Sequence, residues 1–341
     1  MRHTTDTDTD IDRGDWPDAV TPWGDAAWRR AAEAFTAEGL TAHGLRPAGT
    51  RTVRLRPWSV LVRIPTDDGS RVWFKANPPA SRFEAGLALV LDRRVPGRVL
   101  RPLAADAGRG WSLLPDGGPV LDDVLAGADA REATRIWEEI LPRYAQVQQS
   151  LTGHAAELTV AGVPGAHTTA MPALLDRLLA GNAPHLDAAE RARLEAARPR
   201  IAAASEELAA LGIADTLDHA DLHGGQVLRP EPGRYTFFDW GDSSVTHPFC
   251  SLLVTSRIFR RRHGDATLPR LRDAYLEAWT GRGRTSAELR RGLEPALRLA
   301  ALTRATAWGR LFPGNAEAGA APGERPAAAQ WLLRVLDDTR L

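Results

Sequence analysis

Several common features are missing from this sequence of 341 residues, and each absence excludes a class of protein. Cys250 is the only cysteine, so no disulfide can form within the chain. The 43 basic residues balance the 43 acidic ones, whereas a nucleic-acid-binding protein normally has a basic excess. The apolar runs are too short for a membrane span, and the polar N-terminus lacks the apolar core of a signal peptide. We therefore expect a cytoplasmic protein with no nucleic-acid or membrane partner.

Lysine is almost absent as well. Lys75 is the only lysine, and every other residue of the basic set is arginine. This bias, together with the many alanine and glycine residues, is typical of a GC-rich genome. A lysine that persists against such a bias is expected where a compact ammonium group is needed and a guanidinium will not serve. Chance survival of one surface lysine is the alternative, but the position of Lys75 at the end of a predicted strand favours a function.

The first third of the chain is predicted to be rich in strands. Residues 1–15 are rich in Thr and Asp and have no apolar period, which predicts a disordered tail. Residues 16–118 are expected to form an N-terminal lobe. Its predicted helices cover residues 26–37 and 81–92, and its predicted strands cover residues 53–55, 60–64, 72–74, 99–103 and 111–114.

The remainder, residues 119–341, is predicted to be a helical C-terminal lobe. Helical patterns cover residues 130–151, 172–179, 188–211, 248–260, 268–279, 287–311 and 327–336. A β-hairpin over residues 227–238, with its turn at Glu231–Gly233, interrupts the helices. Strands followed by helices predict an α+β fold of two lobes.

The stretch Leu217–Asp242 carries the chemistry. It opens with the pattern His219-x-Asp221-x-x-x-x-Gln226 and continues through the predicted hairpin to Asp239. The hairpin folds the chain between Gln226 and Asp239 back on itself, so both side chains can point at one spot. An amide oxygen and a carboxylate there suit Mg²⁺, which prefers oxygen ligands. Asp221 would face the same spot, where a kinase needs a base for the attacking hydroxyl.

Other interpretations of this stretch stay open. His219, Asp221 and His223 are residue types that bind zinc or a binuclear metal site, although the further ligands of such a hydrolase are not evident. The stretch could also be a structural hairpin with solvated polar flanks, or the remnant of an inactive kinase.

The pattern resembles the catalytic and metal-binding segments of the aminoglycoside phosphotransferase family, a small-molecule branch of the protein-kinase-like fold. The resemblance covers residues 50–335 and implies that Asp221 is the catalytic base, that His219 shapes the catalytic loop, and that Gln226 and Asp239 bind Mg²⁺. Gln226 stands where the family usually has asparagine. Glutamine offers the same oxygen on a longer arm, and maltokinases also carry it, so the departure puts the metal geometry in doubt rather than the metal.

The same resemblance implies an ATP-binding set in the N-terminal lobe. Lys75 would contact the ATP phosphates and Glu84 would hold it by an ion pair, although Ser81-x-x-Glu84 also fits a helix capping box. No G-x-G-x-x-G is present. Ser59, in the turn that replaces the glycine-rich loop, is either a phosphate contact or a plain turn residue. Backbone groups around Leu114 would meet the adenine, unless this is an ordinary connecting loop.

The function implied is ATP-dependent phosphorylation of a hydroxyl on a small molecule, such as an aminoglycoside, an amino sugar or a related natural product, by a monomeric enzyme. His223 would touch the substrate or only satisfy backbone groups, and Asp242 would bind metal or substrate. Acidic residues outnumber basic ones over residues 213–242, which slightly favours a cationic acceptor. A nucleotide-binding pseudokinase and a metal-dependent hydrolase are the alternative functions.

Overall fold

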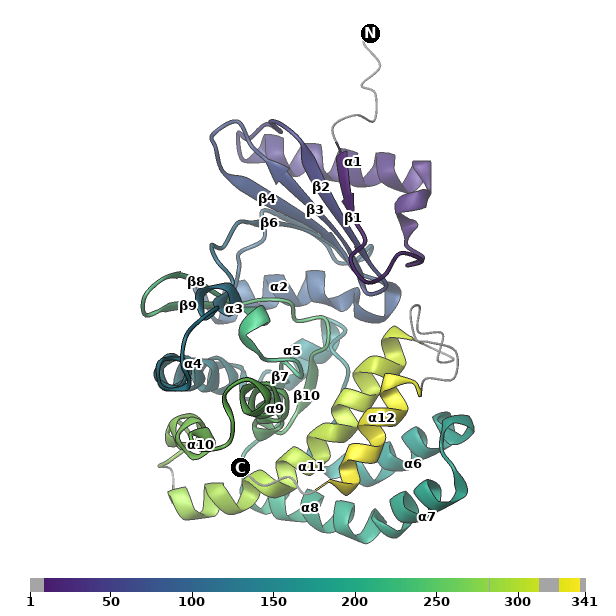
Figure 1. Cartoon of the computed structure of the whole chain (residues 1–341), viewed down its shortest axis with the longest axis vertical. Helices are drawn as coiled ribbons and strands as arrows, with labels where there is room; N and C mark the ends of the chain where they lie inside the picture. The colour runs from purple at the N-terminus through teal and green to yellow at the C-terminus, as the bar shows by residue number, and fades with distance from the viewer. Residues whose placement is uncertain (1–8, 282, 313–324, 338–341) are drawn as a thin grey trace. The chain divides into compact units, whose positions relative to one another are not determined.

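The computed structural model describes residues 9–281, 283–312 and 325–337 (Figure 1). The chain divides into two compact units. One contains the described residues up to Gly117 together with Leu311 and Phe312, and the other contains the rest. Each unit is described by itself below. No helix in the described ranges is both long enough and apolar enough to cross a membrane.

The first unit is built on a six-stranded sheet in the order β1-β2-β3-β4-β6-β5. Helix α1 (Ala26–Ala42) covers one face of the sheet and helix α2 (Phe83–Arg94) lies against the other, as Figure 1 shows. The strands are β1 (Thr9–Asp12), β2 (Arg51–Arg56), β3 (Ser59–Pro65), β4 (Arg71–Ala76), β5 (Ala104–Asp106) and β6 (Trp111–Pro115).

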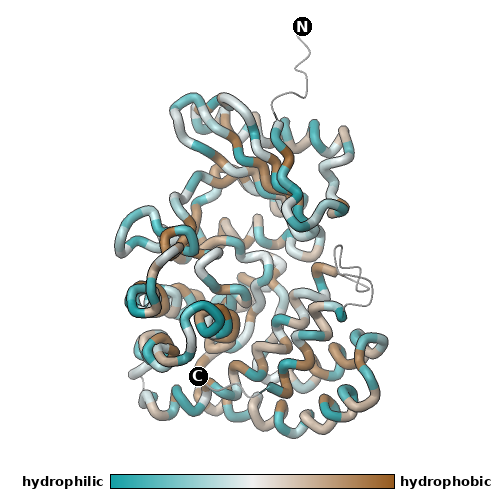
Figure 2. The backbone as a smooth tube through the Cα atoms, viewed as in Figure 1, coloured by the Kyte–Doolittle hydropathy of each residue, from teal (hydrophilic) through white to brown (hydrophobic). Residues whose placement is uncertain are grey.

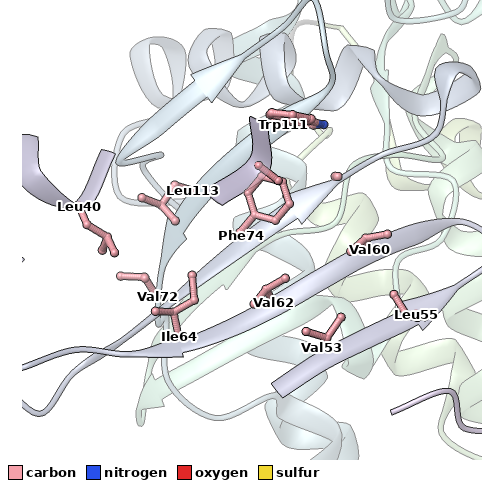
Figure 3. Close-up of a cluster of buried hydrophobic side chains, with 12 residues drawn as sticks. Leu40, Val53, Leu55, Val60, Val62, Ile64, Val72, Phe74, Trp111 and Leu113 are labelled. Carbon is pink, nitrogen blue, oxygen red and sulfur yellow. The ribbon is translucent and has the colours of Figure 1, made fainter. Parts of the chain in front are cut away.

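A period of two in the strand sequences decides which side chains enter the core of this unit. Apolar residues at alternate positions of β3 and β4 point towards α1, where they pack with Trp111 and Leu40 (Figure 3). Phe74 belongs to this buried cluster. Because successive side chains of a strand point to opposite faces, Lys75 emerges on the α2 side of the sheet.

Two expectations for this unit were wrong. The predicted disordered tail extends to residue 15, but residues 9–12 form β1, which pairs in parallel with β2. Asp12 ties this strand to its neighbour through ion pairs with Arg54 at 3.2 Å and Arg56 at 3.1 Å. Residues 1–8 lie outside the described residues. The strand predicted at residues 99–103 begins later, at Ala104, where the ladder with β6 starts.

The second unit is mainly helical. Figure 2 shows brown and teal turns side by side along its helices, as expected for amphipathic helices. They are α3 (Leu121–Val124), α4 (Ala130–Leu151), α5 (Ala155–Val160), α6 (Met171–Gly181), α7 (Ala188–Ala196), α8 (Arg198–Ala210), α9 (Leu252–His263), α10 (Leu268–Glu277), α11 (Ser286–Leu311) and α12 (Ala327–Leu333). The single helix predicted over residues 188–211 is two helices, because Pro199 lacks the N–H that would continue α7.

Two small antiparallel ladders lie among these helices. The predicted hairpin is present as β8 (Val227–Glu231) and β9 (Arg234–Phe237). The second ladder, β7 (Thr216–Asp218) with β10 (Ser244–Thr246), was not predicted from the sequence. Strands β7 and β10 are too short to show an alternating pattern in the sequence. They border the polar stretch between Asp218 and Ser244.

Helix α4 holds this stretch through hydrogen bonds of buried polar side chains. Gln148 donates from Nε2 to the carbonyl oxygens of Leu217 (3.0 Å) and Pro248 (3.2 Å). Tyr275 Oη donates to the other end of the same amide, at 2.5 Å from Oε1. These bonds connect the start and the end of the polar stretch to one rigid helix, which fixes the backbone that carries the site.

Candidate active site

The loop after β7 presents Asp221 by means of a strained turn. Ala220 has a φ of 61°, a left-handed conformation that is unfavourable for alanine. Buried Asp218 holds it, because Oδ1 accepts hydrogen bonds from Ala220 N at 2.9 Å and Ser251 Oγ at 2.5 Å. Burial raises the pKa of the Asp218 carboxyl. Asp218 was not among the site residues expected from the sequence.

His219 lies in the core of the unit, with no exposed surface. Its Nε2 donates to the carbonyl oxygen of Phe238 at 2.9 Å, and its backbone N–H donates to Tyr144 Oη at 3.0 Å. The ring lies 4.7 Å from the ring of Trp240, measured between centroids. His219 therefore ties the loop of Asp221 to the segment around Asp239, and its Nε2 donates to a carbonyl oxygen rather than facing a metal.

Gln226 directly precedes β8 and Asp239 follows β9, so both lie at the open end of the hairpin. Val227 pairs with Phe237, and Phe238 N donates to the carbonyl oxygen of Gln226 at 3.2 Å, so the two predicted metal ligands follow adjacent paired positions. Asp239 has a φ of 63°. Gln226 Nε2 lies 3.5 Å from Asp221 Oδ2. With its NH₂ directed at a carboxylate, the amide can present Oε1 to another partner.

This donor set fits magnesium better than zinc. A glutamine amide and an aspartate carboxylate supply oxygen atoms, and Mg²⁺ is usually held by few protein oxygens together with water and substrate phosphates. Among the described residues, no three His, Cys, Asp or Glu side chains are grouped so that they could hold a metal ion. The zinc interpretation of His219, Asp221 and His223 therefore lacks its geometry.

Asp221 lies between a guanidinium group and an imidazole ring. Its Oδ1 lies 3.0 Å from Nη2 of Arg304, and its Oδ2 lies 3.6 Å from His223 Nε2. Burial alone would raise the pKa of this carboxyl, but the guanidinium of Arg304, assisted by His223 and His219, outweighs it and lowers the pKa. Asp221 is therefore ionised at neutral pH and can accept a proton.

Arg304, on α11, was missed by the sequence analysis. Its side chain is only 6% exposed, and it bridges two carboxylates, with Nη1 at 2.5 Å from Oδ2 of Asp242. Asp242, expected to bind metal or substrate, thus contacts a buried cation. One signal was present in the sequence: Arg304 stands at i+7 from Leu297 and i+4 from Ala300, on the apolar face of a predicted helix.

His223 makes a hydrogen bond within its own loop. Its Nδ1 accepts a hydrogen bond from Gly225 N at 2.9 Å, so it satisfies a backbone group, one of its two predicted roles. Gly224 packs against α3 so closely that an added Cβ would lie 2.0 Å from Oδ1 of Asp122. Asp122 is itself held by both terminal nitrogens of Arg262. The loop therefore needs glycine at position 224.

In the first unit, the structure brings Lys75 and Glu84 together. Lys75 Nζ lies 2.6 Å from Oε2 and 2.8 Å from Oε1 of Glu84, and both side chains are buried. Asn77 Nδ2 also donates to Oε2 at 2.6 Å. Helix α2 begins at Phe83 and has no side-chain cap, so the ion pair forms and the capping box around Ser81 does not.

The remaining predicted residues of the first unit lie on strands. Ser59 begins β3, is buried, and lines a cavity of about 580 Å³ together with Arg56, Arg82 and Arg109. Leu114 lies in β6 opposite Trp73. A phosphate contact for Ser59 and an adenine contact near Leu114 stay predictions.

The comparisons with known proteins agree with this architecture. The model of a family described as the phosphotransferase enzyme family matches residues 49–289. None of the curated proteins compared matches the chain.

Solved structures share the fold at low sequence identity. A type I macrolide 2'-phosphotransferase superposes with a TM-score of 0.57 at 20% identity, covering 92% of this chain and 98% of that one. An ethanolamine kinase from Plasmodium vivax gives a TM-score of 0.57 at 11% identity, covering 89% and 85%. The choline kinase LicA from Streptococcus pneumoniae gives 0.52 at 14% identity, covering 80% and 89%. The predicted α+β fold of the protein-kinase-like type is confirmed.

Proposed function

This chain belongs to the phosphotransferase enzyme family, as the sequence resemblance predicted, and we propose that it transfers the γ-phosphoryl group of ATP to a hydroxyl of a small molecule. The observation that carries the proposal is the loop of the second unit. There an ionised Asp221 lies beside Gln226, which is joined to the segment of Asp239 by a hairpin. A base and two oxygen donors on one short stretch are what phosphoryl transfer needs.

Asp221 would act on the acceptor hydroxyl. One carboxylate oxygen is held by Arg304, and the other faces His223 and Gln226. In the proposed step, the hydroxyl oxygen forms a bond to the γ-phosphorus while the bond from that phosphorus to the β-phosphate oxygen breaks and ADP leaves. The hydroxyl proton passes to Asp221. His219 supports the step by fixing the loop.

Gln226 and Asp239 would hold the metal. Their oxygens are the ligand type that Mg²⁺ prefers, and its charge, when bound, would neutralise the phosphate oxygens. In the first unit, Lys75 would meet the phosphates of ATP. The buried ion pair with Glu84 supports this role, since it holds the ammonium in one position.

The test is ADP release from Mg-ATP with a panel of hydroxylated acceptors, comparing the native enzyme with Asp221→Asn. Asparagine keeps the size of the side chain but cannot accept the proton, so we expect a loss of about 10²–10⁴-fold in turnover. ATP affinity should change little, because Asp221 contacts the acceptor rather than the nucleotide.

The alternatives give different outcomes. ATP binding without turnover for any acceptor would indicate a pseudokinase. Activity that needs no ATP and is indifferent to replacement of Lys75 would indicate a hydrolase. Equal turnover of Asp221→Asn and the native enzyme would exclude the proposed base.

A further inference from the structure

A cavity of about 420 Å³ opens beside Asp221 in the second unit. It lies between α9, α11 and α12, and Figure 1 shows the last two helices side by side. We call it the arginine pocket and define it by Asp221, Arg257, Arg260, Arg261, Arg304 and Trp331. Its volume suits a monosaccharide-sized ligand, since small-molecule sites usually measure about 300–1,000 Å³.

The lining of this pocket is rich in guanidinium groups. Two of its four arginines are closely paired: Arg304 with Asp221 and Asp242, and Arg260 with Asp265 at 2.6 Å. Within the described residues, Arg261 makes no ion pair. Arg257 has only a distant partner, Asp337, at 3.8 Å. Burial, and then the neighbouring Arg334, lower the pKa of Arg257, as expected where cations are gathered together.

The ring of Trp331 contacts two arginines of the pocket, Arg257 and Arg304, and the neighbouring Arg334. Its ring lies 5.5 Å from the guanidinium carbon of Arg257, 5.5 Å from that of Arg304 and 5.6 Å from that of Arg334. Such cation–π contacts attract guanidinium groups without neutralising their charge. Trp331 therefore holds Arg257 beside Arg304 without taking up the charge of Arg257.

Stabilisation of a helix terminus does not account for the pocket. Basic residues in the last turn of α9, such as Arg260 and Arg261, are favourable next to the helix C-terminus. Arg257 lies before that turn, however, and Arg304 comes from a different helix. Guanidinium groups from two helices, aimed at one cavity beside a base, indicate a binding site.

We propose that the arginine pocket binds the anionic group, a carboxylate or a phosphate, of a hydroxylated small-molecule acceptor whose hydroxyl faces Asp221. The inference rests on the proposed phosphotransferase function and names its substrate class. Guanidinium groups pair with both anions in a fork geometry, which suits recognition of either.

The proposal replaces the cationic acceptor that the acidic residues of the loop slightly favoured. Those carboxylates are already engaged in the structure. Asp218 is buried against Ser251, and Asp242 is paired with Arg304. Asp215 accepts from the backbone N–H of Thr168 at 3.0 Å. A cationic acceptor would have to compete with these partners, whereas within the described residues Arg257 and Arg261 of the arginine pocket have no close carboxylate partner.

The experiment compares acceptors of matched size and different charge. ADP release from Mg-ATP is measured with glucose, glucosamine, glucuronate and glucose 6-phosphate, and binding of the same four compounds to the whole chain is measured by calorimetry. We expect activity or binding with an anionic compound only, and the glucuronate and glucose 6-phosphate arms show which anion is recognised. Preference for glucose or glucosamine, or no binding of either anion, overturns the inference.

A charge reversal then tests the pocket itself. Arg261→Glu should raise the KM or Kd for the anionic compound about 10-fold or more and leave the KM for ATP unchanged. Arg193→Glu, on the exposed surface of α7, makes the same change of charge outside the pocket and should have no effect. Equal behaviour of the two variants overturns the inference.

Failure of the proposed function has a separate signature. If none of the compounds supports ADP release but an anion binds to the native chain and not to Arg261→Glu, the pocket is supported and the reaction is not. If glucose or glucosamine is phosphorylated and that activity is lost in Asp221→Asn, the reaction stands and the pocket assignment fails.

Discussion

Each unit of this molecule contains a buried ion pair between a basic residue and a carboxylate, and the two pairs are built differently. In the first unit, one cation meets one carboxylate: Lys75 and Glu84 stand nine residues apart in sequence. In the second, Arg304 serves two carboxylates, Asp221 and Asp242, that come from a distant part of the chain. The first pair is local and balanced, whereas the second is long-range and has an excess of negative charge.

The difference shows what each pair is suited to do. A balanced pair fixes its lysine in one position, which suits a residue that orients a ligand. A single cation shared by two carboxylates lowers the pKa of Asp221 but does not balance the charge of both groups. Asp221 can therefore remain a proton acceptor although it is paired. Removal of the shared cation should consequently have the larger effect.

Arg304→Met should give the largest loss of stability. It leaves two carboxylates close together in a largely buried site, and removal of one partner of a buried ion pair costs about 3–5 kcal/mol. We expect the free energy of unfolding, measured with urea, to fall by that amount. Arg304→Lys keeps the charge but not the forked guanidinium geometry. Its free energy of unfolding should lie between those of the native protein and Arg304→Met. A methionine variant as stable as the native protein would contradict the bridging role.

Lys75→Met should cost less, about 2–3 kcal/mol, because only one carboxylate loses its cation and Glu84 keeps its hydrogen bond from Asn77. The same urea measurement makes the two pairs directly comparable. Lys75→Arg retains the charge and should stay close to native stability but lose turnover, because a planar guanidinium does not replace a compact ammonium. Normal ADP release by Lys75→Arg would contradict that role.

Acid should reduce the contribution of the Asp221–Arg304 pair to the free energy of unfolding. The pKa of Asp221 is lowered in the folded state, so its contribution to stability is complete above the unfolded value of about 4 and is lost as the pH falls through the lower folded value. The difference in unfolding free energy between the native protein and Asp221→Asn should therefore be constant at neutral pH and shrink below about pH 4. A difference that begins to shrink near pH 6 would contradict the lowered pKa.

An exposed pair gives the smallest effect. Asp12 contacts Arg54 and Arg56 on β2, and its side chain is 36% exposed. Exposed ion pairs contribute about 0.2–1 kcal/mol, so Asp12→Ala should lower the thermal midpoint only slightly. Asp10→Ala, on the same strand, is the matched control. A loss comparable to that of Lys75→Met would mean that β1 is held by Asp12 much more firmly than an exposed pair allows.

Much of the candidate site could be predicted because its parts are close in sequence. The spacing of a strand, Lys75 and a helix that carries Glu84 predicted the ion pair of the first unit. The loop His219-x-Asp221 and the hairpin between Gln226 and Asp239 are likewise local. The strand at residues 9–12 was missed because a short polar segment becomes a strand only when a neighbouring strand, here β2, supplies its hydrogen bonds.

Local sequence patterns were enough to predict the α+β fold, because alternation, helical period and turn residues act over a few positions. The motif from His219 to Asp239 pointed to the family and to the candidate residues of the loop. The cation that pairs with Asp221 could be identified only in the folded chain. Arg304 is one of many arginines in the chain, and no local pattern distinguishes it as the partner of a loop far away in sequence. The packing of α11 against that loop selects it, and the same packing gathers Arg257, Arg261 and Trp331 into one pocket. Charge pairing in this protein is thus a property of the assembled helices.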